Sequence, residues 1–365
     1  MVLFGGRWRL LVGVGSAMAV GCSSPSSEVR GDDLLGVFEA DAGTKDAGAA
    51  SSAASARPRG SASPALSGFA ASGASSSRVV STRAPETDRC VEPAGEPAAA
   101  PTRTLGRPAC RGAEILEWRD ATGAPRYACL FAAPDEVKGP APLVVFFPGD
   151  GPTIDSPTAV HKQTSLRSLQ GKMPLGGAEK GFHILAIQGR ALPGSATASF
   201  DTSFTSSDNV DVATTTHFVG VLEERRMVDP RRIYALGLGP GGTMAATWAM
   251  IAADRVAAFG SLAAEPPRAV WSCPGPPPPG VVLYRACDAV TSCEGVERFL
   301  EGRESARAET RAFRLGDDAK EVLNCEPRNA CGNKRGTAAH YRWSKGLEKP
   351  ILTFFSEHAL AVPPL

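Results

Sequence analysis

The sequence predicts an α/β domain with a mainly parallel sheet and helices on both faces, preceded by a disordered N-terminal tether. Apolar runs that suit strands alternate along the chain with segments of helical pattern. Two runs, residues 142–147 (PLVVFF) and 182–188 (FHILAIQ), are almost continuously apolar, which is typical of strands buried on both faces. In residues 228–253, a short strand, a glycine-rich turn and an Ala- and Met-rich helix follow one another directly.

The individual elements follow in chain order. Residues 113–119 and 126–132 suit the two strands of an opening hairpin. Further strands are expected at 142–147, 182–188, 233–236, 257–264, 280–286 and 351–355, and helices at 209–225, 243–253 and 294–302. A body of about 260 residues is long enough to bury a full hydrophobic core, so we expect one domain at 106–365.

The N-terminus carries the features of an export signal. A basic start (RWR, residues 7–9) precedes an apolar stretch at 10–20 that is too short to span a bilayer comfortably. Residues 19–22 (AVGC) resemble a bacterial lipobox, whose cysteine becomes lipidated. Residues 1–22 are therefore expected to be a lipoprotein signal peptide, with Cys22 as the site of lipid attachment.

The next segment, residues 23–105, consists mainly of Ala, Ser, Gly and Pro. Such a composition cannot bury enough apolar surface to offset its ordering entropy, so we expect a disordered linker. Together with Cys22 this linker predicts an exported protein anchored in a bacterial cell envelope, at the outer membrane or facing the periplasm. The alternative is a secreted protein with an ordinary signal peptide.

Composition excludes some partners and leaves others open. A formal net charge of +1 with 21% charged residues gives no reason to expect a nucleic-acid partner. Eight cysteines remain after Cys22, and outside the cytoplasm they allow up to four disulfides. They are Cys90, Cys110, Cys129, Cys273, Cys287, Cys293, Cys325 and Cys331. No metal is expected, because the sequence contains no CxxC motif and its other histidines lack the spacing of metal ligands. These histidines suit the core or the surface instead: His161, His183, His217 and His340.

The glycine-rich turn allows two interpretations. Gly237, Gly239 and Gly242 match the dinucleotide fingerprint GxGxxG, and Glu265 follows at a suitable distance. A dinucleotide-binding protein is therefore one alternative, although a weak one. Two buried strands precede the turn, whereas the fingerprint usually lies in the first βαβ unit, and an exported chain meets little nicotinamide cofactor. We expect no cofactor.

The other interpretation is a nucleophile elbow. The lead-in VDPRRIYALGL (228–238) and the trailing GGTMA (241–245) resemble secreted esterases of the polyhydroxybutyrate depolymerase and feruloyl esterase type. The segments PGDG (148–151), VVLYRACDAV (281–290) and PILTFFSEHALAVP (350–363) extend this resemblance. The resemblance implies an α/β-hydrolase-like fold for the region from Cys110 to the end of the chain.

The resemblance also implies a set of site residues. Gly239 stands at the nucleophile position, Asp288 at the catalytic acid and His358 at the catalytic histidine. Gly149, Asp150 and Pro240 correspond to the oxyanion loop and donor. The resemblance further favours a local Cys325–Cys331 disulfide, and a bridge from Cys287 would hold the loop of the acid.

Several of these positions depart from a working esterase. Gly239 has no hydroxyl, and loss of the nucleophile typically lowers turnover about 10⁶-fold. Pro240 has no N–H to donate to an oxyanion, and Asp150 places a negative charge where negative charge would develop. Ser261 and Thr243 are the other hydroxyls near the turn, but neither stands in the elbow. We expect a catalytically inactive domain, and leave its status as an enzyme open.

The sequence therefore predicts an exported lipoprotein whose hydrolase-like domain binds a ligand or a partner. That ligand would be an ester, a polyester or a glycan-linked molecule, and the partner an envelope protein. The first alternative is an active carboxylester hydrolase, resembling a polyester depolymerase or feruloyl esterase, with an unrecognised nucleophile. Dinucleotide binding and a purely structural envelope role are the others.

Overall fold

The computed structural model describes part of the chain, and all of the described residues belong to one compact unit, Gly73–Leu365. They are residues 91–101, 103–149, 160, 163–177, 180–193, 198–268, 271–272, 275–286, 288, 290–315, 340 and 346–361. The predicted signal peptide, Cys22 and the linker up to residue 90 lie outside these ranges. Among the described residues, no helix has the length and apolar character needed to cross a bilayer.

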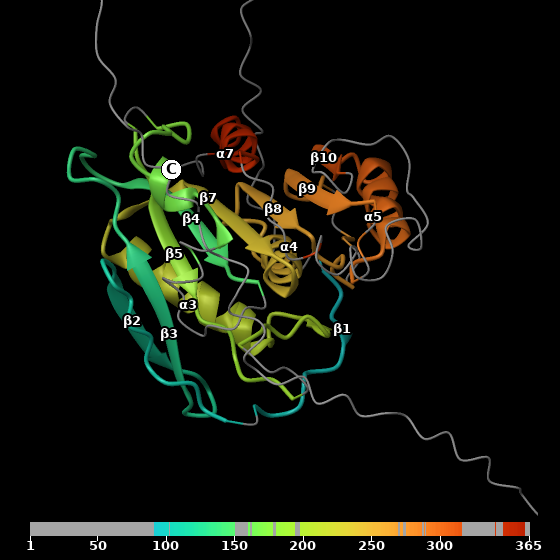
Figure 1. Cartoon of the computed structure of the whole chain (residues 1–365), viewed down its shortest axis with the longest axis horizontal. Helices are drawn as coiled ribbons and strands as arrows, with labels where there is room; N and C mark the ends of the chain where they lie inside the picture. The colour runs from blue at the N-terminus through green and yellow to red at the C-terminus, as the bar shows by residue number, and fades with distance from the viewer. Residues whose placement is uncertain are drawn as a thin grey trace, which may run out of the picture. The chain divides into compact units, whose positions relative to one another are not determined.

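An eight-stranded sheet forms the centre of this unit (Figure 1). From edge to edge its strands are β10 (Thr310–Leu315), β9 (Gly280–Arg285), β8 (Ala258–Leu262), β7 (Val228–Leu238), β4 (Ala141–Phe147), β5 (His183–Ile187), β3 (Pro125–Phe131) and β2 (Glu114–Arg119). The six strands from β10 to β5 are parallel, and β3 and β2 continue the sheet antiparallel. The predicted α/β-hydrolase-like fold class is confirmed, with the glycine-rich turn following the central strand β7.

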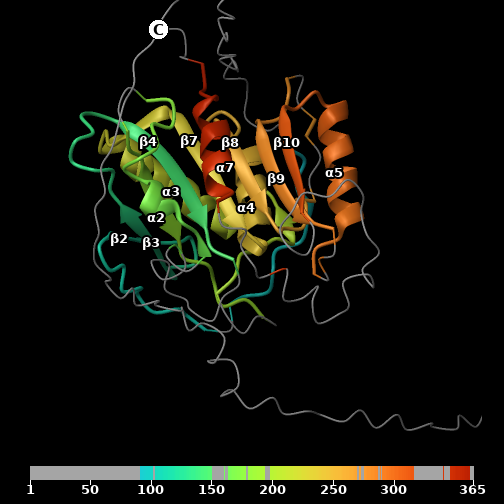
Figure 2. The same cartoon turned by 45° about the horizontal axis from the view of Figure 1, so that its top comes forward.

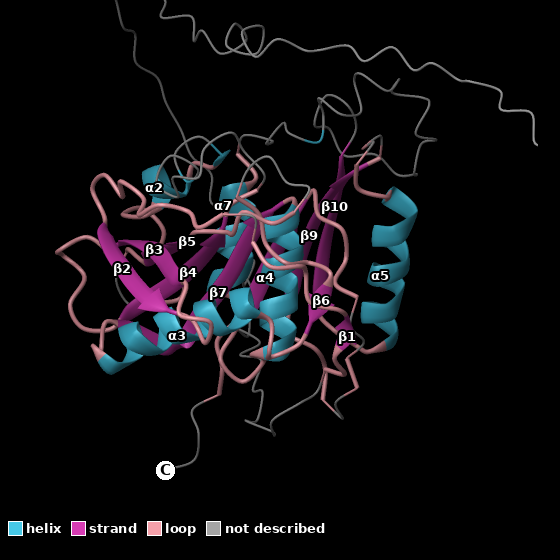
Figure 3. Cartoon of the chain, turned by 90° about the horizontal axis from the view of Figure 1, so that it is seen from below, coloured by secondary structure: helices cyan, strands magenta, loops and turns pink. Residues whose placement is uncertain are grey.

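Helices cover both faces of the sheet, because neighbouring residues of a strand point to opposite sides. The helices are α2 (Leu166–Leu169), α3 (Val210–Glu224), α4 (Pro240–Ile251), α5 (Cys293–Ser305) and α7 (Glu348–Ser356). On β4, Val144 and Phe146 join the core under α7, which lies in front of the sheet in Figure 2. Val145 and Phe147 join the core under α3 and α4, which Figure 3 shows in front of the other face.

The last predicted strand, at residues 351–355, is wrong, because this segment lies in helix α7. Ile351, Leu352, Phe354 and Phe355 are all buried, and their spacing places them on one helical face. A short apolar run alone does not separate a strand from a helix. The sheet edge is instead formed by β10, whose sequence TRAFRL carries two arginines and gave no strong apolar signal.

The folded body begins before the predicted boundary at residue 106. We call residues 91–101 and 103–107 the N-terminal strap, because they run along the body and pair with it at several points. Strand β1 (Ala94–Gly95) pairs antiparallel with β6 (Phe204–Thr205), and Arg103 forms an isolated bridge with Ala191. Val91 forms a further isolated bridge with Trp271, so the folded body extends back to at least residue 91.

A buried ion pair fixes the segment between β5 and α3. The Arg190 guanidinium donates to both carboxylate oxygens of Asp211, at 2.8 and 2.9 Å. Asp211 also accepts from the Asp201 N–H at 2.8 Å, and Asp201 accepts from the Ala98 N–H of the strap at 2.7 Å. Burial alone would lower the pKa of Arg190, but Asp211, Asp201 and Asp120 together raise it above its ordinary value.

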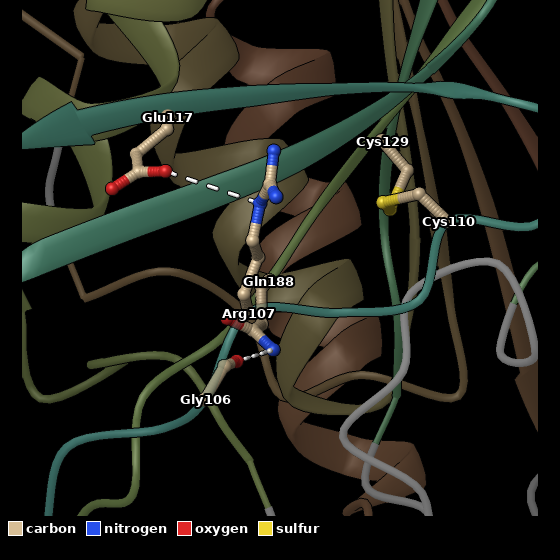
Figure 4. Close-up of a disulfide and its surroundings, with 6 residues drawn as sticks. All are labelled: Gly106, Arg107, Cys110, Glu117, Cys129 and Gln188. Atoms are coloured by element: carbon tan, nitrogen blue, oxygen red, sulfur yellow. Dashed lines mark hydrogen bonds and ion pairs between the residues drawn. A yellow bond between two sulfur atoms is a disulfide. The ribbon is translucent and has the colours of Figure 1, made fainter.

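One disulfide lies wholly within the described residues. Cys110 and Cys129 are bonded across 19 positions of sequence, with their Cα atoms 5.5 Å apart (Figure 4). The bond ties the segment after the strap to β3, and closing a loop of this length is worth about 3 kcal/mol in chain entropy. Cys293 is also disulfide-bonded. The predicted Cys325–Cys331 pair and Cys287 lie outside the described residues.

Removing one partner of the buried ion pair should be costly. Asp211→Ala leaves the Arg190 charge buried and poorly compensated, so we expect the free energy of unfolding in urea to fall by about 3–5 kcal/mol. The matched control is Glu114→Ala, which breaks an ion pair with Arg225 whose side chains are 49% and 43% exposed. The free energy of unfolding of Glu114→Ala should fall by no more than about 1 kcal/mol. Equal losses for the two variants would contradict this assignment.

His183 should make stability depend on pH. Its Nδ1 accepts from the Ala133 N–H at 2.9 Å, and its Nε2–H donates to the Met227 carbonyl at 3.0 Å, so the ring is neutral. Burial lowers its pKa, and the bond to Met227 offsets this only in part. Below about pH 6.5 the unfolded chain binds a proton that the folded chain does not, so stability falls as pH decreases. Urea unfolding at pH 7.5 and 5.5 should show a smaller loss for His183→Gln than for the parent chain.

Candidate functional site

The turn between β7 and α4 is the centre of the candidate site. β7 ends at Leu238, Gly239 adopts φ 55° and ψ −129°, and α4 begins at Pro240. The Gly239 N–H donates to the Leu262 carbonyl at 2.8 Å, and the Gly239 carbonyl accepts from the Gly242 N–H at 2.8 Å. A positive φ is costly for residues with a side chain. The backbone therefore has the strained strand-to-helix geometry of a nucleophile elbow.

The other glycines of this turn allow β7, α4 and the neighbouring strands to approach closely. A Cβ on Gly237 would clash with the Gly241 carbonyl oxygen, and one on Gly241 would clash with the Phe147 carbonyl oxygen. A Cβ on Gly242 would lie 2.7 Å from the Cβ of Ala264. The fingerprint-like spacing therefore has a packing explanation, which weakens the dinucleotide alternative.

The other residues named near the turn also have structural roles. The Glu265 carboxylate accepts from the Ser292 N–H at 3.0 Å, where α5 begins. The Thr243 hydroxyl donates to the Glu265 carbonyl at 2.6 Å. Ser261 is buried within β8 and is 6% exposed. None of these residues takes the place of a side chain at the tip of the turn.

A buried histidine and aspartate face each other beside the turn. His340 Nδ1 lies 2.8 Å from Asp288 Oδ2, and both residues are buried. Asp288 Oδ1 accepts from the Val290 and Thr291 N–H groups at 2.8 and 3.1 Å. Because the ionised carboxylate only accepts hydrogen bonds, the proton of the imidazole is expected on Nδ1, which leaves Nε2 as the basic nitrogen. We call this pair the Asp288–His340 dyad.

The dyad is aimed at the position where the elbow side chain would stand. A Cβ built on Gly239 would lie 3.8 Å from His340 Nε2, and no other described atom comes within 4 Å of it. A hydroxyl one bond beyond that Cβ would come within about 2.6–3.2 Å of Nε2, the reach expected of a nucleophile and its base. The imidazole of His340, itself in contact with Asp288, thus faces the position that a side chain at residue 239 would take.

The predicted position of Asp288 beside the elbow agrees with this arrangement, but the predicted histidine does not. His358 lies just after α7, where its Nδ1 is 2.7 Å from the Phe354 carbonyl and its Nε2 is 3.1 Å from a Glu309 carboxylate oxygen. The prediction of His358 depended on a strand at 351–355, and the helix found there turns this residue toward its own last carbonyls. No local motif in the sequence marks His340.

The predicted oxyanion positions offer little to a developing negative charge. Pro240 has no N–H. The Gly149 N–H donates to Gln163 Oε1 at 3.0 Å, and Gln163 Nε2 donates back to the Gly149 carbonyl at 3.2 Å. Asp150 lies outside the described residues. The Asp288–His340 dyad therefore lies beside a turn that has no attacking side chain at residue 239, and the Gly149 N–H already has an acceptor.

Comparisons with known proteins find remote structural likenesses. No family model and no curated protein matches the chain. A thermostable esterase has 18% identity and a TM-score of 0.48 over 68% of this chain and 64% of its own, so the chain spans less than two thirds of it. Propionate-bound esterase 2 of Thermogutta terrifontis has 16% identity and a TM-score of 0.46 over 67% of this chain and 95% of its own. Likenesses this remote say nothing about activity.

The conformation of Gly239 should make any side chain there costly. We expect Gly239→Ala to lower the free energy of unfolding by about 1–3 kcal/mol, because φ 55° strains an alanine although space exists for its Cβ. The control is Gly220→Ala within α3, where a Cβ would meet nothing within 4 Å. That change should stabilise by about 0.5–1 kcal/mol. A neutral or stabilising Gly239→Ala would show that the turn is not strained.

Proposed function

We propose that this chain is an exported protein whose α/β-hydrolase-like domain binds a ligand or a partner without hydrolysing it. The observation that carries this proposal is Gly239, which places no side chain where the Asp288–His340 dyad is aimed. A base without a nucleophile has nothing to activate at the elbow. Export and the lipid anchor on Cys22 rest on the sequence pattern alone.

Two independent losses support the absence of esterase turnover. Removing the nucleophile of a serine hydrolase costs about 10⁶-fold in turnover. Removing one oxyanion donor costs about a further 10²–10³-fold, and Pro240 provides none. The N–H of Gly149, a second candidate oxyanion donor, already donates to the side-chain amide oxygen of Gln163. A residual rate after such losses would be close to that of buffer.

The ligand or partner is proposed only as a class, on the strength of the sequence resemblance. A site that retains the dyad at the carboxyl ends of the strands suits an ester, a polyester segment or a glycan-linked ester. If the partner is a macromolecule, we propose an envelope protein that binds over the same site. The rival function, an active carboxylester hydrolase, would need a nucleophile elsewhere, and the hydrogen bond of Thr243 and the burial of Ser261 argue against both nearby hydroxyls.

Restoring the missing hydroxyl tests the proposal. The parent chain should show no turnover of short aryl esters above buffer and no covalent labelling by a fluorophosphonate probe. Gly239→Ser should be labelled at residue 239, detected by mass spectrometry, because His340 can accept the proton of the new hydroxyl. Adding Pro240→Ala should raise the labelling rate. Gly239→Ala, which carries the same backbone strain without a hydroxyl, is the matched control.

Two further changes in the Gly239→Ser background identify the base. Adding His340→Gln should abolish labelling, whereas adding His358→Gln should leave it unchanged. The opposite pattern would restore His358 as the catalytic histidine. Ester hydrolysis by the parent chain that is lost with His340→Gln would establish the active-enzyme alternative instead.

A further inference from the structure

A small cavity lies apart from the dyad, between the N-terminal strap, the start of β3 and the segment after β5. Its volume is about 260 Å³, and no residue of the β7–α4 turn or of the dyad lines it. The strap contributes Pro101, Arg103 and Leu105, and Arg126 and Tyr127 come from β3. The remaining wall is the segment that follows β5. One strap contact nearby is visible in Figure 4, where Gln188 Nε2 donates to the Gly106 carbonyl at 3.2 Å.

Three arginines from three separate segments converge on this cavity. They are Arg103 from the strap, Arg126 from β3 and Arg190 from the segment after β5. Like charges repel at short range, so an assembly of this kind requires compensation. Arg126 donates to the Asp120 carboxylate through the arginine Nε and Nη2. Arg190 donates to the Asp211 carboxylate through the same two arginine nitrogens.

The carboxylates hold two of these guanidinium groups in fixed orientations. The Arg126 and Arg190 side chains are 10% and 5% exposed, and among the described residues their hydrogen bonds use only Nε and Nη2. Each therefore keeps the Nη1 donors for another acceptor. Arg103 is exposed and has no carboxylate partner among the described residues. The cavity is thus lined by two guanidinium groups that carboxylates hold in place and by a third, exposed arginine.

The charges around the cavity favour a singly charged anion over a doubly charged one. The three arginines carry three positive charges, and Asp120, Asp201 and Asp211 carry three negative ones, so the formal sum is zero. A dianion such as phosphate would add two negative charges beside three buried carboxylates. A single planar carboxylate adds one, and its geometry matches the donors of a guanidinium. Pro101, Leu105 and Tyr127 suit a small apolar body attached to it.

We propose that this cavity binds a small organic monocarboxylate, held by Arg103, Arg126 and Arg190. The proposal does not depend on the function proposed for the dyad. Because the strap supplies one wall and one of the three arginines, an occupied cavity fastens the strap to the body. The ligand then stabilises the point at which the N-terminal segment joins the fold.

Calorimetric titration of the full-length chain with butyrate tests this site. We expect saturable binding, with butyramide, the neutral isostere, binding at least about tenfold more weakly because it lacks the charge. Inorganic phosphate should also bind more weakly than butyrate. Hydrogen exchange of the amides at residues 98 and 103–105 should slow when butyrate is bound.

Two exposed arginines of the strap provide a matched pair of variants. Arg103→Gln removes a cavity residue and should weaken butyrate binding about tenfold. Arg107→Gln removes a neighbouring arginine that does not line the cavity and whose ion pair with Glu117 is 3.9 Å long and solvent-exposed. It should leave binding unchanged. Absence of saturable butyrate binding, or equal effects of the two variants, would overturn the proposal.

Discussion

The close approach of β7 and α4 at Gly239 is the constraint on which the rest of the site depends. Glycines at 237, 241 and 242 remove the Cβ atoms that would clash with neighbouring backbone. Strand β7 can therefore turn into α4 within one residue, directly against the ends of β4 and β8. This contact brings the loop after β4 and the loop after β8 to the same place. The dyad lies where these carboxyl ends meet, as is general for ligand sites of open α/β sheets.

The dyad also has a structural role that does not require catalysis. Asp288 accepts two backbone N–H groups in its own loop as well as the imidazole of His340. A buried carboxylate needs such partners, because an unpaired buried charge is strongly destabilising. The pair thus holds the loop after β9 against a distant part of the chain. This structural role keeps Asp288 and His340 paired whether or not the turn carries a nucleophile.

A second buried charge network, next to the carboxyl end of β5, attaches the strap. Arg190, Asp211 and Asp201 link the segment after β5 to α3, and Asp201 holds the backbone of Ala98. The Cys110–Cys129 disulfide fixes the chain where the strap enters the sheet. The charges and the disulfide together determine where the extended N-terminal segment ends and the folded domain begins.

The sequence by itself determined the fold class, the strands β2, β3, β4, β5, β7, β8 and β9, and the position of the elbow; the two-residue strand β6 gave no signal. These features rest on local signals: apolar runs, the glycine spacing of residues 237–242 and the order of segments along the chain. The sequence alone also shows that Gly239 has no hydroxyl and that Pro240 has no backbone N–H, since both are properties of single residues. Asp288 was assigned through the resemblance to secreted esterases, in which the acid follows an apolar strand.

Only the tertiary structure decided which histidine partners Asp288, whether residues 351–355 form a strand or a helix, and where the body begins. His340 reaches Asp288 across 52 positions of sequence, and no local periodicity records a contact of that range. The five-residue apolar run at 351–355 fits either period, so its packing against β8 was needed to choose helix α7. The strap has the composition of a linker, and it is ordered by backbone pairing and by the Asp201 carboxylate, which lie far away in the sequence. Local patterns specify elements, whereas contacts between distant segments are specified by how those elements pack.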